Sequence, residues 1–350
     1  MFLYFFSAQF YNFFEFHRYE DIIKKEDDAG YDKTAFEKML EIKGDSDHTK
    51  LIDMLTDLND YSIGIEDVLK EHFDEENIIY WMVFQILMGN VDTQNRNVYL
   101  YSPLNSDIWY FIAWDNDGCL MRPEYELRNF SDQNSWEKGI SNYWGNILFQ
   151  RCLKSRSFRE KLNDAILDLR EYLNKDMLTS KIESYKNVLK PYLYSMPDAE
   201  YEPLTSEQYD QIAASLPDEI EKNYQLYLES LETPMPFFIG VPTIDGDKLK
   251  FNWDVSYDLD AEDITYSVEV ARDYLFRDVI YQNTTLTVPE AEMDLLEAGQ
   301  YFVRVRATNT SGKTQDAFDY YVTDEGKHYG MKCFYITEDN TVEKDIYEEG

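Results

Sequence analysis

The chain has 350 residues, enough for about two domains that each bury a core. Its 33 lysine and arginine residues are outnumbered by 68 aspartate and glutamate residues, which leaves a formal net charge of −35. The electric field of such a negative chain repels nucleic acid and anionic lipid. The charge therefore argues against a nucleic-acid-binding protein and against one that binds anionic membranes. The three cysteines, Cys119, Cys152 and Cys333, are widely spaced and lack a C-x-x-C pair, which indicates neither a disulfide framework nor a zinc site.

The N-terminal region is rich in aromatic residues, but no signal peptide is visible because it has neither a basic start nor a small-residue cleavage site. Its apolar run is also too broken for a membrane span. Residues 1–20 fit either a buried strand or the start of a buried helix, since periodicity cannot decide over so short a piece. Residues 21–48 are charged and predict a loop, a short helix and a loop. Apolar spacing then predicts a helix over residues 49–58. Residues 61–69 predict a turn followed by another helix, with Ile65, Val68 and Leu69 as its apolar positions.

The stretch from Trp81 to Gly118 carries the most informative pattern of the chain. The helix that leads into it, over residues 78–88, is apolar on nearly every side, which predicts a helix buried all round. Residues 98–101 and 108–114 are rich in β-branched and aromatic residues and flank a turn-rich segment, so they predict an antiparallel hairpin. The residues before the first strand of a hairpin and after its second strand lie at the same end.

Asp92 and Asn97 precede this hairpin, and Asp115 and Asp117 follow it, so the four side chains are predicted to face one another. Three carboxylates held together away from water repel unless a cation neutralises them. Hard oxygen ligands of this kind suit Mg²⁺ or Mn²⁺ completed by phosphate oxygens and water. The D-x-x-x-x-N spacing of Asp92 and Asn97 is that of a protein-kinase catalytic loop, in which the aspartate takes the acceptor's proton and the asparagine holds metal.

Two simpler interpretations apply to the same residues. An aspartate-rich loop at a hairpin end is often turn chemistry, in which Asn and Asp side chains bond nearby backbone groups. The run from Asp115 also has some features of a calcium loop, since Glu126 falls twelfth in it, but an EF-hand needs glycine at the sixth position and Gly118 is fourth. Two separate acidic motifs joined by one hairpin favour the metal-nucleotide interpretation.

The segment GNVDTQNRNVYLY, followed by WYFIAWDND, resembles the signature of the spore coat protein H (CotH) kinase family of atypical protein kinases, N-x-D-x-x-x-x-N-x-x-L-Y and then W-D-x-D. The resemblance implies that Asp92 is the catalytic-loop acid and Asn97 its metal-binding partner. It also implies that Asp115 is the metal ligand equivalent to the aspartate of the kinase DFG motif, with Asp117 as the second acid. The implied cofactors are ATP and either Mg²⁺ or Mn²⁺. Unlike ordinary protein kinases, the chain has Asn90 and Val91 before Asp92 in place of His and Arg.

The parts of a kinase that clamp the nucleotide are not visible in this sequence. No G-x-G-x-x-G loop occurs, and no lysine is predicted in an apolar strand; the candidates in hydrophilic context are Lys24, Lys25, Lys33, Lys38 and Lys43. Members of the family usually carry a β-rich lobe before the motif. The sequence is therefore expected to begin late, with a partial or missing N-terminal lobe, either as a fragment or as a pseudokinase.

The region after the hairpin predicts a helical lobe. Residues 120–139 are polar and lie where an activation-type or substrate-binding loop would be, although a plain surface connection fits as well. Ser157 is predicted as the N-cap of a helix over residues 158–173, and Pro217 as a helix-start residue in a region of one or two helices. Further helical spacing begins at Trp144 and covers residues 178–193 and 206–231. The apolar stripes of these helices are predicted to be core, including Ile182, Tyr185, Leu189 and Tyr192.

Pro234 and Pro236 mark a boundary where the hydrophobic period changes from helical to alternating. Strands are predicted beyond it over residues 249–253, 265–271, 285–288 and 301–308, a spacing typical of an all-β sandwich. Leu296, Gly299 and Tyr301 resemble the L-x-x-G-x-Y turn of a tyrosine corner, and Trp253 is predicted as a core aromatic. This region resembles a fibronectin type III module. The tail is expected to add a strand over residues 331–337 and then fray.

The sequence thus predicts an α+β fold with three parts. Residues 1–232 form an atypical protein-kinase-like domain, a mostly helical C-lobe with the motif-bearing hairpin; residues 233–325 form the fibronectin type III-like sandwich, and residues 326–350 a tail. The predicted function is metal-dependent transfer of phosphate from ATP to serine or threonine of a surface or secreted protein. The alternative is a catalytically degenerate surface or secreted protein whose sandwich module binds a protein or glycan partner. The resemblance implies a location at a spore or cell surface, or outside the cell; no nucleic-acid partner is expected.

Overall fold

The computed structural model describes residues 4–7, 41–43, 49–94, 97–127, 136–324 and 326–345. Helices and strands are mixed, as the α+β class requires. The chain divides into two compact units, one made of residues 1–131 with 146–227 and the other of residues 132–145 with 228–350. The short helix expected within residues 21–48 lies outside the described residues. No helix in the described part of the chain is long and apolar enough to cross a membrane.

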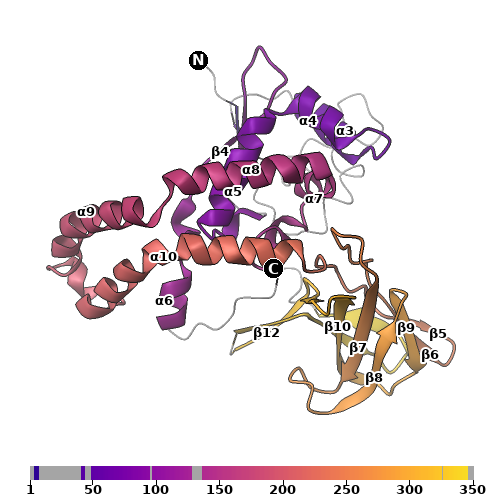
Figure 1. Ribbon diagram of the computed structural model, residues 1–350. Helices are drawn as coiled ribbons and strands as arrows, with labels where there is room; N and C mark the ends of the chain where they lie inside the picture. The colour runs from indigo at the N-terminus through magenta and orange to yellow at the C-terminus, as the bar shows by residue number, and fades with distance from the viewer. Residues whose placement is uncertain are drawn as a thin grey trace. The chain divides into compact units, whose positions relative to one another are not determined.

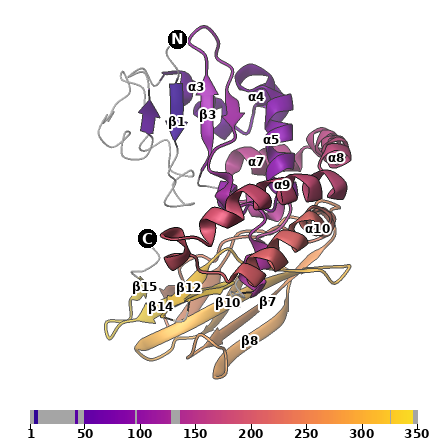
Figure 2. The same cartoon turned by 90° about the vertical axis from the view of Figure 1, so that its left-hand side faces the viewer.

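The predicted hairpin is confirmed and belongs to a larger antiparallel sheet. Its strands are β3 (Tyr99–Ser102) and β4 (Tyr110–Ile112), with Tyr99 opposite Ile112. The strand β1 (Tyr4–Ser7) pairs with β3 and with β2 (Glu41–Lys43), so the sheet order is β2-β1-β3-β4 (Figure 2). Of residues 1–20, for which a strand and a helix were both open, residues 4–7 form a strand, and the others lie outside the described residues. Lys43 ends β2, a three-residue strand that also contains Glu41 and Ile42.

The helix α5 (Glu75–Leu87) is the centre of the first unit. Asp74 caps its N-terminus by accepting a hydrogen bond from the Asn77 backbone N–H at 2.9 Å. Burial on nearly every side is confirmed, since eight of its side chains are buried: Ile78, Ile79, Trp81, Met82, Val83, Gln85, Ile86 and Leu87. Asn77 also joins the helix to β4, because its amide accepts from the Phe111 N–H at 2.6 Å and donates to the Phe111 carbonyl at 3.1 Å. The hairpin is therefore held on a rigid, buried helix.

Four further helices build the first unit around α5. The predicted helices α3 (Thr49–Asn59), α4 (Ile65–His72) and α7 (Ile147–Lys154) are confirmed. The helix α8 (Arg156–Tyr172) packs across α5 (Figure 1). Its N-cap is Ser155, whose hydroxyl accepts from the Phe158 N–H at 3.3 Å, so the prediction of Ser157 as the cap was wrong by half a turn.

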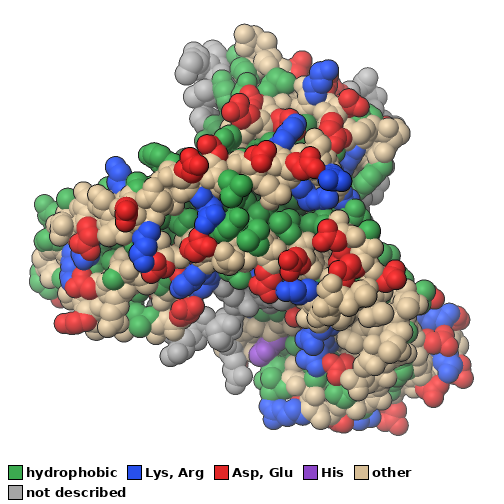
Figure 3. All heavy atoms as spheres, viewed as in Figure 1, with side chains coloured by type: hydrophobic (Ala, Val, Ile, Leu, Met, Phe, Trp, Pro, Cys, Tyr) green, Lys and Arg blue, Asp and Glu red, His purple; other side chains and the backbone are tan. Residues whose placement is uncertain are grey.

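The helices α9 (Lys175–Leu193) and α10 (Ser206–Leu231) form a hairpin joined by ion pairs, such as Lys190 with Asp210 at 2.6 Å. Pro217 lies inside α10, which is a single helix rather than two. The predicted core stripe of α9 is corrected, because Tyr185, Leu189 and Tyr192 are exposed by 62%, 51% and 68%. Hydrophobic side chains accordingly reach the surface at this end of the helices (Figure 3). The 3.6-residue period identified an apolar face, but no helix in the described part of the chain covers it.

The second unit contains two sheets that face each other across one core. The smaller sheet has the order β5-β6-β9 and the larger has the order β15-β14-β10-β7-β8, with β11 beside β10 and a separate β12–β13 ribbon. The strands are β5 (Thr243–Asp245), β6 (Lys248–Asn252), β7 (Ile264–Ala271), β8 (Val279–Leu286), β9 (Glu290–Asp294), β10 (Gly299–Asn309), β11 (Thr314–Asp316), β12 (Tyr320–Thr323), β13 (Gly326–Tyr329), β14 (Met331–Ile336) and β15 (Val342–Lys344).

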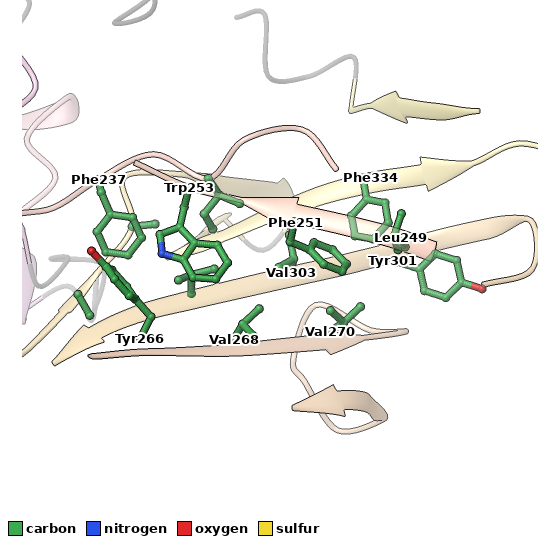
Figure 4. Close-up of a cluster of buried hydrophobic side chains, with 14 of the residues drawn as sticks. Phe237, Leu249, Phe251, Trp253, Tyr266, Val268, Val270, Tyr301, Val303 and Phe334 are labelled. Atoms are coloured by element: carbon green, nitrogen blue, oxygen red, sulfur yellow. The ribbon is translucent and has the colours of Figure 1, made fainter. Parts of the chain in front are cut away.

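Both aromatic residues that the sequence assigned to the core are buried. Trp253 and Tyr301 are exposed by 5% and 6% and lie among the side chains between the two sheets (Figure 4). The Tyr301 hydroxyl donates to the Glu297 carbonyl at 3.0 Å, the short upstream bond of a tyrosine corner. The alternation of buried and exposed side chains therefore placed this core correctly.

Three details of the strands differ from the sequence expectation. The strand expected over residues 331–337 of the tail is β14, but it pairs with β10 inside the larger sheet rather than following a finished domain. The strand β8 covers residues 279–286 instead of 285–288, and β9 was not predicted. Both are polar strands with few buried side chains, so their period-2 signal is weak.

Candidate functional site

The end of α5 leads directly into the first motif. Gly89 adopts a left-handed conformation with φ of 60°, the N–H of Asn90 donates to the Gln85 carbonyl at 3.0 Å, and the N–H of Gly89 donates to the Ile86 carbonyl at 3.1 Å. This pair of bonds is a Schellman motif, which ends a helix sharply and favours glycine at its left-handed position. The turn sets Asn90 beside the helix it has just left, and Asp92 follows as the first residue of a short 3₁₀ helix, residues 92–94.

The second motif follows β4 as another tight turn. Asp115 precedes the 3₁₀ helix η3 (Asn116–Gly118) and has a left-handed backbone with φ of 50°. Asn97, just before β3, has φ of 55°. Asparagine and aspartate are among the few non-glycine residues that enter this region readily, and such conformations cluster at functional sites. Since Tyr99 pairs with Ile112, Asn97 and Asp115 lie at the same end of the hairpin.

Three amide side chains, Gln85, Asn90 and Asn116, form a hydrogen-bonded cluster between the two motifs; we call it the amide triad. Gln85 Nε2 donates to Asn116 Oδ1 at 3.1 Å, and Asn90 Nδ2 donates to Gln85 Oε1 at 2.9 Å and to Asn116 Oδ1 at 3.4 Å. Asn90 Oδ1 in turn accepts the backbone N–H of Asp92 at 3.2 Å. The triad therefore joins the backbone of the first motif to the turn of the second.

Asp92 packs directly against the second motif. A Cβ placed on Gly118 would lie 3.0 Å from Asp92 Oδ2 and 2.8 Å from Asn90 Oδ1, so only glycine leaves room for this approach. Burial raises the pKa of the neighbouring Cys119 thiol to about 12; a hydrogen bond with Asn90 opposes this rise, and the carboxylates of Asp117 and Asp92 add to it. Carboxylates from both motifs thus influence the same thiol.

The exposure of the four predicted residues is uneven. Asp92 and Asn97 are half-buried, whereas Asp115 and Asp117 are exposed. No hydrogen bond among the described residues links Asn97 to the three carboxylates, and no group of three His, Cys, Asp or Glu side chains in the described ranges is arranged to hold a metal. Carboxylate and amide oxygens still have the donor chemistry of a Mg²⁺ site that phosphate oxygens and water complete. The residues fit an ion that arrives with a nucleotide better than one held by protein alone.

A second polar network lies next to the turn of the second motif. Arg122, at the start of α6 (Arg122–Leu127), forms an ion pair with the buried Glu219 at 3.1 Å and donates to Asn223 Oδ1 at 2.6 Å. Asn223 Nδ2 donates to the Leu87 carbonyl at 2.9 Å, at the end of α5. The helix α10 is thereby bonded both to the segment after the second motif and to the helix before the first.

Sequence reasoning did not identify Gln85, Glu219 or Asn223 as parts of this arrangement. The available signal for Gln85 was its position as a single amide inside an otherwise apolar helix, seven residues before Asp92. Glu219 and Asn223 carry no comparable signal, because acidic and amide residues are frequent throughout α10 and their partners lie about a hundred positions away.

Comparison with known proteins gives a match to a protein family. The family model described as "CotH kinase protein" matches residues 7–227. No curated protein matches the chain. Among solved structures, surface layer protein SbsC, domains 1–6, is 11% identical with a TM-score of 0.16, and the S-layer protein rSbsC(31-844) is 10% identical with a TM-score of 0.14. Each comparison covers 93% of this chain but only 41% and 46% of the other, and likenesses this weak carry no argument about fold.

Proposed function

Because the chain belongs to the CotH kinase protein family, we propose that it is a metal-dependent atypical protein kinase that transfers the γ-phosphate of ATP to a serine or threonine of a surface or secreted protein. One observation carries the proposal: Asp92 of the first motif packs against Gly118 of the second, within a polar network that joins both. A kinase needs this juxtaposition, since the catalytic-loop acid and the metal-binding acid act on opposite sides of one transferred phosphoryl group.

Each residue of the two motifs has a proposed role. Asp92 orients the acceptor hydroxyl and accepts its proton while the new P–O bond forms and ADP leaves. Asn97 and Asp115 would hold Mg²⁺ or Mn²⁺, with Asp117 as a further carboxylate ligand. The ion, when bound, neutralises charge on the phosphate oxygens. With a net charge of −35 and few basic residues around the motifs, this chain depends on that neutralisation to bring a nucleotide close to its carboxylates.

We also propose the domain assignment. Residues 1–232 correspond to a kinase-like lobe and the sandwich beyond them to a fibronectin type III-like module. Support for the module comes from three strands, β5, β6 and β9, facing a sheet in which β8, β7, β10 and β14 are neighbours, and from the Tyr301 hydrogen bond. The family assignment supports a location at a spore or cell surface or outside the cell.

One observation favours the alternative of a catalytically degenerate binding protein. The sequence has no G-x-G-x-x-G loop, which in protein kinases covers the phosphates. In this alternative the sandwich module carries the function by binding a protein or glycan partner. The two functions differ in their response to nucleotide, because a ligand that binds the native state raises the melting temperature. A shift with ATP and Mg²⁺ supports the kinase, and no shift with any nucleotide supports the binding protein.

Phosphate transfer is tested with γ-³²P-labelled ATP, Mg²⁺ or Mn²⁺, and dephosphorylated casein as the acceptor, with self-labelling measured in parallel. The variants are Asp92→Asn and Asp115→Asn, and the control is Asp107→Asn, which removes an exposed carboxylate in the hairpin turn, away from the motifs. We expect Asp92→Asn to lose about a hundredfold or more of the activity, as for a removed catalytic acid or base. Asp115→Asn should also lose most of the activity, because it removes a ligand of the metal that the phosphate transfer needs. Full labelling by both motif variants would exclude the assigned roles.

A further inference from the structure

We propose that Gln85 is a positioning residue that fixes the separation between Asp92 and the turn that carries Asp115 and Asp117. Gln85 does not reach the reacting groups; it acts through Asn90 and Asn116. The inference concerns how the site is held and rests on the proposed phosphotransfer for its chemical meaning.

The side chain of Gln85 is fully buried, and both ends of its amide are used. Its Nε2 donates to Asn116 at 3.1 Å, and its Oε1 accepts from Asn90 at 2.9 Å. Asn90 then accepts the backbone N–H of Asp92 at 3.2 Å. A continuous chain of hydrogen bonds therefore runs from the second motif, through one residue of a buried helix, to the first motif.

The helix makes Gln85 suited to this task. The motif loops follow α5 and β4, and each could shift by itself on the surface, since loops are less restrained than the elements they connect. Gln85 stands on α5, which Asn77 joins to β4 at Phe111. One rigid helix thereby fixes the positions of both motif loops. A displacement of about 1 Å between reacting groups can cost about a hundredfold in rate, so this positioning matters for catalysis.

A purely structural role for Gln85 predicts a different outcome. If the amide only satisfies buried polar groups, its loss lowers overall stability and leaves the relation between the loops unchanged. Methionine has nearly the volume and shape of glutamine but makes no such hydrogen bonds. Gln85→Met therefore keeps the packing of α5 and removes both bonds of Gln85, which leaves only the long 3.4 Å bond between Asn90 and Asn116 to join the motifs. Two readouts separate the roles: the local exposure of the loops and the rate of the chemical step.

Cys119 reports on the loops directly. Its thiol is half-buried, and its pKa responds to the Asn90 amide and to the carboxylates of Asp92 and Asp117. Cys152, in the same unit, is fully buried and reports on global opening. The full chain without metal is treated with iodoacetamide, and mass spectrometry follows the alkylation of each cysteine separately.

The test compares Gln85→Met and Asn116→Ala with wild type and with Gln225→Met. Asn116 is the triad member at the half-buried turn, so its replacement tests the same link without changing α5. Gln225 lies on the exposed face of α10, where its amide bonds Glu221, and gives a matched glutamine-to-methionine control. The kcat and KM of phosphate transfer are measured for the same proteins.

We expect alkylation of Cys119 to accelerate about tenfold or more in both triad variants, with Cys152 still protected, because local opening exposes the loops alone. We also expect a loss in kcat of about tenfold or more with little change in the KM for ATP, as for a misplaced reacting group. Unchanged Cys119 alkylation in both folded triad variants, or equal acceleration at Cys152, overturns the proposal. If wild type transfers no phosphate, the proposed function fails, while Cys119 still decides whether Gln85 holds the loops together.

Discussion

Gly118 lies so close to Asp92 that a Cβ on the glycine would stand 3.0 Å from the Asp92 carboxylate oxygen Oδ2. This approach joins two motifs that are separated in sequence by a β-hairpin. The same Cβ would lie 2.8 Å from Asn90 Oδ1, so the amide triad is affected as well. The contact depends on the absence of a side chain at one position, and it can be tested by adding a single methyl group.

Gly118→Ala should disrupt the site more than it disrupts the fold. The added methyl group forces Asn90 and Asp92 away from the turn, and overpacking of this kind costs about 1–3 kcal/mol. We expect a lower melting temperature and loss of any phosphate transfer, measured by differential scanning fluorimetry and by labelling. Gly64→Ala is the control, since its nearest neighbour in the structure is 3.6 Å away. Equal behaviour of the two variants would show that Gly118 is not tightly packed.

Gly89→Ala combines a backbone penalty with a steric one. The left-handed φ of 60° costs an alanine about 1–2 kcal/mol, and the new Cβ would lie 2.7 Å from Asn223 Nδ2. Gly312→Ala meets a similar backbone penalty at φ of 81° with no atom within 4 Å. The free energy of unfolding should therefore fall further for Gly89→Ala, as measured in urea. If Gly312→Ala is equally costly, the contact with Asn223 contributes nothing.

Lys332→Met should destabilise the sandwich in a pH-dependent way. Lys332 and Asp319 form a buried ion pair at 2.8 Å, and removing one partner of such a pair costs about 3–5 kcal/mol. Burial raises the pKa of Asp319, and the Lys332 ammonium opposes that rise, so the folded-state pKa is higher still in the variant. When the pKa of a carboxyl is higher in the folded than in the unfolded state, the stability of the protein falls as the pH rises from the unfolded pKa to the folded pKa.

The loss in the free energy of unfolding caused by Lys332→Met should accordingly be larger at about pH 7.5 than at about pH 4.5, where the Asp319 carboxyl is closer to neutral. Urea unfolding at the two pH values measures it. Lys327→Met, which replaces a lysine on the nearby β13 ribbon whose ammonium lies 4.6 Å from the Tyr320 ring centroid, serves as control. A deficit that does not change with pH would mean that Asp319 is not the group left uncompensated.

The exposed apolar stripe of α9, which contains Tyr185, Leu189 and Tyr192, should tolerate substitution with little loss of stability. Leu189→Ala should change the free energy of unfolding by no more than about 0.5 kcal/mol, because the leucine is 51% exposed. The same substitution at Leu162, fully buried on α8, should cost about 2–5 kcal/mol. Chemical denaturation compares the two directly. A comparable loss at Leu189 would mean that the stripe is covered in solution.

The sequence predicted those features that depend on local pattern. The run around Trp81 was apolar on nearly every side and forms a buried helix, while two aromatic and β-branched runs flanking a turn form β3 and β4. The same reasoning placed Trp253 and Tyr301 in the core of the sandwich. These predictions succeeded because burial and turn chemistry act over a few residues.

Features that depend on distant partners could not be predicted in this way. The apolar stripe through Tyr185 and Leu189 has a helical period, but a period does not say whether another element covers it. Likewise, Gln85 bonds Asn116, 31 positions away, and nothing near either residue identifies the other. Of the candidate site, the sequence thus supplied the residue types of the two motifs, and the structure supplied the network between them.

Isothermal titration calorimetry with ATP, with and without Mg²⁺, tests most directly whether the two motifs form one metal-nucleotide site. Wild type should bind ATP only when Mg²⁺ is present, and Asp115→Asn should weaken that binding about tenfold or more, or about 1.4 kcal/mol. Asp107→Asn should bind as wild type does. Binding that needs no metal and is unaffected by Asp115→Asn, or no binding under any condition, would contradict the assignment.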